Sequence, residues 1–224
     1  MILSHVDFEE QVEISSQTIS VLVVEDEEKY FEICNEIFLQ CEGADGNFVL
    51  SENGKSLSFA KDVRFVADCF SLTFKDKKAQ NALLATVCKL IEQKMLTEFS
   101  DLNQKVFGFL DKLNAESDFA IEYDLDVTAQ ALLKSYNVRW KEDDGAGFLD
   151  KLVSYVNFCS ALLNTKLFVF VGLKNFLTEE QLRKFYHEMS LAEANVLLLE
   201  NVCRRKLENE RIKVIDRDLC EIVV

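Results

Sequence analysis

The sequence has 224 residues, of which 49% are hydrophobic, and it carries a net charge of −14 and no proline. This length allows one full core and a smaller appendage, because single domains most often have ~100–150 residues. The negative charge argues against broad attraction to nucleic acid, so any such binding requires a local basic surface. The apolar stretches are shorter than the ~20 residues of a membrane helix, which predicts a soluble, cytoplasmic protein with no membrane partner.

The seven cysteines are an odd number and form no CxxC pair. Most of them lie inside apolar runs of the sequence. This distribution is typical of reduced core cysteines in a reducing compartment, and it disfavours a metal or catalytic role.

The first 75 residues alternate between strand and helix signals. Apolar residues within Val6–Ile14 predict a hairpin or a bent edge strand, and Thr18–Val24 predicts a buried strand. Acidic residues from Glu25 to Glu28 favour the start of a helix, because the helix dipole stabilises negative charge there. Asn53-Gly54 predicts a tight hairpin turn.

A long helical period follows, from Lys77 to about Asn114. Its apolar stripe predicts one helix of ~50 Å or a helical hairpin with a break near Thr97–Asp101. A helix of this length is longer than a compact domain, so we expect it to protrude. The alternative is an ordinary pair of core helices, since helices in globular domains average ~11–12 residues.

An acidic segment comes next, in which carboxylates alternate with apolar residues. Asp118, Glu122, Asp124 and Asp126 can line one face of an extended segment. Oxygen ligands of this kind suit a hard cation, Ca²⁺ more than Mg²⁺. The EF-hand pattern is absent, and a solvated acidic turn is the alternative interpretation.

The segment after the acidic residues predicts a short helix at Val127–Ser135 and a short strand at Asn137–Trp140. It contains a local basic cluster in an otherwise acidic chain, made of Lys134, Arg139 and Lys141. An amphipathic helix is then predicted at Phe148–Leu163.

A strand, a helix and a strand follow within residues 165–200. The continuous apolar runs Leu167–Val171 and Val196–Leu199 predict strands that are covered on both faces. Thr178 and Gln181 form a capping box at the start of the helix between them. This is a βαβ unit with parallel strands. Two more strands are predicted at Arg211–Ile215 and Leu219–Val223.

The sequence contains no motif that specifies catalysis. The turn after Val171 reads GLKNFLT, and neither GxxxxGK[ST] nor GxGxxG occurs. DDGAG, at residues 143–147, is interpreted as a plain helix start because its aspartates repel an anion. His5 and His187 have no nucleophile signature nearby, so we interpret both as structural or surface residues.

The pattern of the whole chain resembles the Csn-two family of type II-A CRISPR-associated proteins, which act in spacer acquisition. The strongest match is TKLFVFVGLKNFLTEEQL followed by NVLLLE. ALLKSYNVRW with the later FLDKLVSYV, and the opening EEQVEISSQTISVLVVEDEEKYFEICNEIF, also match. Residues 45–116 match only in helical character, and the proline often found in the family's first hairpin is absent.

The resemblance implies an α/β fold with a degenerate P-loop-NTPase-like head, a parallel or mixed sheet and a protruding α-helical leg domain. The head would comprise residues 1–74 and 118–224, and the leg residues 75–117. The family forms a homotetrameric ring that binds Ca²⁺ and threads double-stranded DNA ends through a basic hole. The resemblance therefore assigns metal binding to Glu122, Asp124 and Asp126, and contact with DNA to Lys134, Arg139 and Lys141.

Further expected partners are the other CRISPR adaptation proteins and the effector nuclease, and no enzymatic activity is expected. Two alternatives remain open. One is a metal-dependent nuclease or phosphatase that uses the acidic cluster of residues 118–126. The other is an α/β protein-interaction module that binds no nucleic acid.

Overall fold

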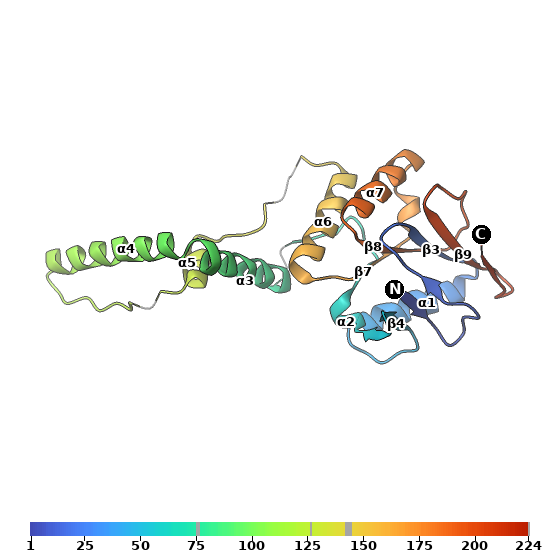
Figure 1. The fold of residues 1–224 in the computed structure, drawn as a ribbon, viewed down its shortest axis with the longest axis horizontal. Coiled ribbons are helices and arrows are strands. Elements are labelled where there is room, and N and C mark those ends of the chain that lie inside the picture. The colour runs from blue at the N-terminus through green and yellow to red at the C-terminus, as the bar shows by residue number, and fades with distance from the viewer. Residues whose placement is uncertain (75–76, 126, 142–144, 224) are drawn as a thin grey trace. The chain divides into compact units, whose positions relative to one another are not determined.

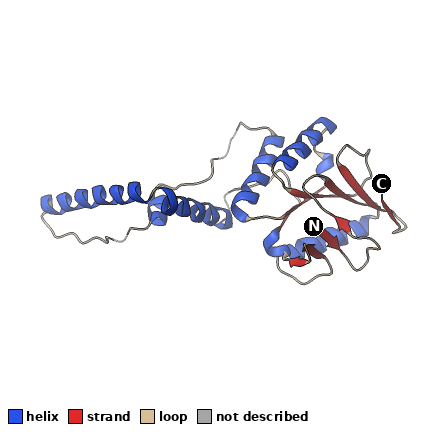
Figure 2. Ribbon diagram, viewed as in Figure 1, coloured by secondary structure: helices blue, strands red, loops and turns tan. Residues whose placement is uncertain are grey.

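A computed structural model describes residues 1–74, 77–125, 127–141 and 145–223. The chain forms two compact units, and each is described by itself. Unit 1 contains Met1–Thr73 and Asp143–Val224, and unit 2 contains Phe74–Glu142. The described strands all belong to unit 1, whereas unit 2 is helical (Figure 2). None of the described helices is long and apolar enough to cross a membrane.

A six-stranded sheet forms the centre of unit 1 (Figure 1), in the order β10-β9-β3-β8-β7-β6. The four neighbouring pairs from β9 to β6 are parallel, and β10 is antiparallel to β9. The strands are β3 (Ile19–Val24), β6 (Val63–Val66), β7 (Leu167–Val171), β8 (Asn195–Glu200), β9 (Glu210–Ile215) and β10 (Glu221–Val223).

The predicted βαβ unit is confirmed. Helix α7 (Glu179–Leu191) connects β7 to β8, and Leu167 pairs with Asn195 in the parallel register. Thr178 Oγ1 accepts from Gln181 N at 3.3 Å, and Gln181 Oε1 accepts from Thr178 N at 2.9 Å. This capping box supplies acceptors to two backbone N–H groups that the first helical turn leaves unpaired.

Both faces of the sheet are covered, which explains why its strands are continuous apolar runs. Alternate β7 residues, such as Leu167 and Val169, share a core with Ile33 and Ile37 of helix α1 (Glu27–Cys41). Phe170 points to the other face, where its ring lies 5.7 Å from that of Phe185 on α7. Helix α6 (Phe148–Leu163) begins and ends as predicted.

A second, four-stranded antiparallel sheet completes unit 1, in the order β2-β1-β4-β5. Its strands are β1 (Ile2–Ser4), β2 (Val12–Glu13), β4 (Val49–Glu52) and β5 (Lys55–Leu57). Asn53 and Gly54 both have positive φ, at 50° and 76°, as the predicted hairpin turn requires. The shorter elements of unit 1 are α2 (Phe59–Asp62) and the 3-10 turn η1 (Leu173–Asn175).

Unit 2 contains α3 (Lys77–Lys94), α4 (Leu96–Glu116) and α5 (Ala129–Ser135). Only Met95 separates α3 from α4, and its φ of −134° interrupts the helical backbone. The break predicted near residues 97–101 therefore lies slightly earlier. Helical hydrogen bonding nearly continues across it, since Met95 N donates to Ile91 O and Phe99 N to Met95 O.

The division of the chain differs from the predicted one at its second boundary. The prediction places residues 118–142 in the head, but they belong to unit 2. The physical reason is hydrogen bonding to the helices. Ile121 N donates to Asn114 Oδ1 of α4 at 2.9 Å, and Gln80 Nε2 of α3 donates to Val138 O at 2.6 Å.

The predicted strand Asn137–Trp140 is wrong, because this segment pairs with no other strand among the described residues. Its backbone groups bond locally instead. Asn137 N donates to Lys134 O and Val138 N to Leu133 O, with Asn137 in the left-handed region at φ 50°.

Candidate nucleic-acid interface

The loop between β3 and α1 is the place where a phosphate would bind if the head held a nucleotide, because it joins a central parallel strand to a helix N-terminus. A carboxylate occupies that helix N-terminus instead. Asp26 Oδ1 accepts from Lys29 N at 2.8 Å, and Glu27 and Glu28 lie in the first turn. The loop is therefore self-capped and negative, which opposes an incoming phosphate.

In the turn after β7, a carboxylate likewise accepts from a backbone N–H that a phosphate could otherwise use. Gly172 adopts φ 63°, and the buried carboxylate of Glu200, at the end of β8, accepts from Lys174 N at 3.0 Å. Burial raises the pKa of Glu200. The Lys174 ammonium points into the protein, where it lies 2.7 Å from Glu210 Oε1.

Glu210 is the centre of a buried polar network. Tyr186 Oη donates to its Oε1 at 2.5 Å, and Leu207 N donates to its Oε2 at 2.9 Å. Burial, followed by the bond to Glu210, raises the pKa of Tyr186. Among the described residues, no buried side-chain nitrogen or oxygen lacks a partner. The network is thus fully satisfied internally and presents no free group to a substrate.

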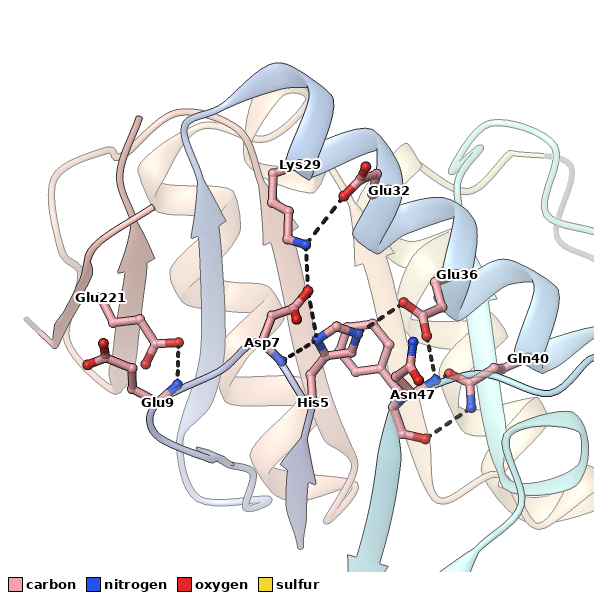
Figure 3. A network of polar contacts seen from close by, with 10 residues as sticks. His5, Asp7, Glu9, Lys29, Glu32, Glu36, Gln40, Asn47 and Glu221 are labelled. Atoms are coloured by element: carbon pink, nitrogen blue, oxygen red, sulfur yellow. Dashed lines mark hydrogen bonds and ion pairs between the residues drawn. The ribbon is translucent and has the colours of Figure 1, made fainter. Parts of the chain in front are cut away.

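A second network surrounds His5 on unit 1 (Figure 3). Asp7 N donates to His5 Nδ1 at 3.1 Å, so Nε2 carries the proton and donates to Glu36 at 3.0 Å. Lys29 Nζ reaches Asp7 at 2.7 Å. The His5 ring also packs 4.3 Å from the ring of Phe48. These bonds join the chain after β1 to α1, and they support the structural interpretation of His5. His187 is exposed on α7.

The three basic residues predicted to contact DNA come from one short stretch of unit 2. Lys134 lies in the last turn of α5, and Arg139 and Lys141 lie in the irregular segment that follows it. All three are exposed. Long, flexible cations on a surface can reach phosphate oxygens without reading bases.

Neighbouring contacts hold this basic segment against unit 2. The Trp140 ring stacks on Phe74, with 6.1 Å between centroids and 21° between planes. Gln80 of α3 binds Val138 O, as described above. Val138 and Trp140, the residues on either side of Arg139, therefore hold this segment to α3 and to Phe74.

The acidic residues predicted to bind metal are only partly within the described chain. Glu122 and Asp124 are exposed in an irregular segment, and Asp126 lies outside the described residues. No three His, Cys, Asp or Glu side chains gather as a metal site in the part that the structure describes. Tyr123, between them, donates to Asp111 of α4, which raises the tyrosine pKa.

Helix α4 has an apolar face that unit 2 leaves uncovered. All of its residues are described and none is buried. Leu102, Val106, Phe109 and Leu113 are between 40% and 64% exposed. Their spacing of four, three and four residues is that of a coiled-coil seam. Such a seam fits another helix.

Sequence reasoning missed two groups of residues. Lys174 lies in the turn after β7 and Glu210 begins β9, so no local pattern links these two buried partners. The rings of Phe70, Phe148 and Phe176 come together from distant parts of the chain, so no local pattern indicates them.

A comparison with models of known protein families identifies the family of this chain. The model of the family described as "CRISPR-associated protein (Cas_Csn2)" matches residues 40–219. The chain belongs to the Cas_Csn2 family. The resemblance seen in the sequence is confirmed, and the match spans parts of both units.

Other comparisons add little to the Cas_Csn2 assignment. A search of curated proteins found no match. Among solved structures, a "Putative ABC transporter (ATP-binding protein)" from Pyrococcus furiosus is 11% identical, with a TM-score of 0.40. The alignment covers 95% of this chain and 97% of that one. The α/β fold class is established by the parallel sheet described above.

Proposed function

We propose that this Cas_Csn2 protein acts in CRISPR spacer acquisition as a homotetrameric ring that binds double-stranded DNA ends without sequence preference. Membership of the CRISPR-associated family carries the proposal. Its partners are then double-stranded DNA, further copies of the chain, the other adaptation proteins and the effector nuclease, in the cytoplasm. In this function the protein binds DNA and catalyses no reaction.

The exposed basic segment supports the DNA-binding part of the proposal. Lys134, Arg139 and Lys141 lie within eight residues, in a chain whose net charge is −14. Four copies facing one hole would concentrate positive charge where a single subunit has little. The acidic β3–α1 loop agrees with a head that holds no nucleotide.

The uncovered face of α4 supports the assembly. A seam of four large apolar side chains in contact with water is unfavourable, and closed symmetric oligomers bury such faces. Calcium at Glu122, Asp124 and Asp126 belongs to the same proposal. It would offset acidic charge in the unit that carries the basic segment, because Glu122 and Asp124 belong to unit 2 as well.

An electrophoretic mobility assay tests the proposal. Linear duplexes of several sequences are compared with a closed circle of the same length, each with Ca²⁺ and with a chelator. A ring loaded from an end binds every linear duplex and fails on the circle, and its affinity falls steeply with salt. Equal binding to circular and linear DNA would overturn end loading.

Electrophoresis of the same DNA also distinguishes a protein that only binds DNA from the alternative, a metal-dependent nuclease. Incubation of linear duplex with Mg²⁺ produces no shorter product if the protein only binds DNA. Product that disappears on replacing Glu122 and Asp124 by Ala would favour the nuclease.

A further inference from the structure

Three neighbouring parallel strands of unit 1 each lead into a loop that contributes to one surface. The loop after β6 carries Phe70, the turn after β7 carries Phe176, and the loop after β8 carries Arg204 and Arg205. Because β6, β7 and β8 are adjacent and parallel, these loops leave the same edge of the sheet. In open α/β sheets, ligands bind outside the carboxyl ends of the strands.

The aromatic part of this surface is a built cluster of rings. Phe70 stacks on Phe148, the first residue of α6, with 5.0 Å between centroids and 25° between planes. Phe176 meets Phe70 edge to face, also at 5.0 Å. Phe148 is partly buried, whereas Phe70 is 67% exposed and Phe176 45% exposed. The cluster thus holds an aromatic ring in a fixed orientation with much of its area in water.

The basic part lies directly beside the rings. Arg204 donates to Asn175 Oδ1 at 2.6 Å, and Asn175 immediately precedes Phe176. Arg205 is exposed and has no hydrogen-bond or ion-pair partner among the residues that the structure describes. Both arginines belong to the run Arg204-Arg205-Lys206, which has three consecutive cations in a chain with 39 acidic residues.

We propose that Phe70, Phe148, Phe176, Arg204 and Arg205, here called the aromatic–basic surface, bind single-stranded DNA. Bases stack on the exposed rings, and the arginines contact the adjoining phosphates. Single-stranded nucleic acid sites combine these two features, because every base has a face to stack and every linkage has a charge. The partner is anionic and planar, which matches the chemistry of the surface. A purely apolar partner would not use the arginines.

This site is separate from the basic segment of unit 2, and it extends the proposed function. Unpaired nucleotides arise where a duplex end frays, so a protein that binds ends meets them. The two sites lie on different units, which allows each to be removed alone.

One acidic residue opposes the ligand. The Asp68 carboxylate accepts from Phe70 N at 2.8 Å and from Ser71 Oγ. These bonds lower the pKa of Asp68, so a negative charge lies against the backbone N–H of Phe70 at neutral pH. Replacing it with asparagine keeps an acceptor and removes the charge. Asp68→Asn is therefore expected to tighten binding a few-fold.

The test uses the full-length protein and a fluorescein-labelled dT12 oligonucleotide, followed by fluorescence anisotropy. Phe70→Ala is expected to weaken binding about tenfold, within the range of ~1–3 kcal/mol for one stacked base. Phe31→Ala is the matched control, because Phe31 is also 67% exposed but lies on α1. Wild-type affinity in Phe70→Ala, or an equal loss in Phe31→Ala, would overturn the proposal.

Two more variants separate stacking and charge. Phe70→Leu keeps an apolar side chain and removes the ring, so it must also weaken dT12 binding. Retained affinity for dT12 in this variant would show that the bases do not stack on the Phe70 ring, and it would overturn the proposal. Arg205→Ala is expected to reduce the salt slope by about 0.7, the value for one neutralised phosphate on a single strand. Arg217→Ala, at another exposed arginine, must leave that slope unchanged.

Blunt linear duplex is measured on the same variants to distinguish the two sites. Phe70→Ala must keep its affinity for duplex, and the variant with Lys134, Arg139 and Lys141 replaced by Ala must keep its affinity for dT12. Wild-type protein that binds dT12 and not duplex contradicts the proposed function and leaves this site standing. Wild-type protein that binds duplex and not dT12 overturns this site.

Discussion

Lys174 Nζ lies 2.7 Å from Glu210 Oε1, and the two side chains are 3% and 0% exposed. The pair joins the turn after β7 to the start of β9, on the far side of β8 and β3. Tyr186 and Leu207 complete the hydrogen bonds of the same carboxylate. A charge pair so deeply buried depends on both members, because a single buried charge has no water to replace its partner.

Lys174→Met is expected to lower the free energy of unfolding by about 3–5 kcal/mol, since it leaves Glu210 buried without its cation. Chemical denaturation measures this loss. Lys184→Met is the control, because Lys184 pairs with Glu180 at 2.8 Å on the surface of α7, where both are more than 60% exposed. That variant is expected to leave the free energy of unfolding almost unchanged, because solvent screens an exposed pair. Equal losses would contradict the structural role of the buried pair.

Glu200 is expected to make stability depend on pH. Its pKa is raised by burial, so the folded protein holds the proton more tightly than the unfolded chain. Its contribution is therefore full below the unfolded pKa of about 4.5 and is lost as the pH rises through the folded pKa. Glu200→Gln keeps an acceptor for Lys174 N. Between pH 5 and pH 8, the free energy of unfolding of this variant should change less than that of the wild type. Urea midpoints that change with pH in parallel with wild type would exclude this role.

Phe109→Ser is expected to weaken the oligomer, because Phe109 is 64% exposed in the seam of α4. Burial of one large apolar side chain contributes ~1.5–3 kcal/mol, so the dissociation constant should rise about tenfold or more. Light scattering at micromolar concentration measures the mass against 25.7 kDa for one chain. Phe31→Ser, at an equally exposed position on α1, should leave the mass unchanged. A wild-type monomer would contradict the tetramer itself.

Replacing Lys134, Arg139 and Lys141 together by Ala is expected to weaken all linear duplexes alike, because bonds to phosphates carry no sequence information. The slope of log affinity against log salt should decrease by about 0.9 for each phosphate that the variant no longer neutralises. Arg183 and Lys184 of α7, replaced by Ala, are the control for a general change in charge. An unaltered slope in the triple variant would show that these residues do not contact the DNA.

Chelation is expected to lower the melting temperature if Ca²⁺ binds at Glu122, Asp124 and Asp126. A ligand at 100 times its Kd stabilises by ~2.7 kcal/mol, and each 1 kcal/mol moves the Tm of a protein of this size by about 2–4 °C. Glu122→Ala with Asp124→Ala should abolish the difference. Identical melting curves with and without chelator would leave these carboxylates as a solvated surface.

The elements of unit 1 could be predicted because their signals are local. The apolar run Leu167–Val171, the Thr178 capping box and the Asn53-Gly54 turn each depend on a few neighbouring residues. The boundary after the leg could not be predicted in this way. Ile121 and Val138 are held to α4 and α3 by bonds to Asn114 and Gln80, and such bonds leave no periodic pattern.

The sequence by itself determined the family, the parallel βαβ unit and the amphipathic leg, because apolar periodicity and capping residues act over one or two helical turns. The tertiary structure alone decided which distant side chains meet. It placed Lys174 against Glu210, and it brought Phe70, Phe148 and Phe176 together at the carboxyl edge of the sheet. These contacts depend on the order of the strands. That order is set by long-range packing, which leaves no signal in a short stretch of sequence.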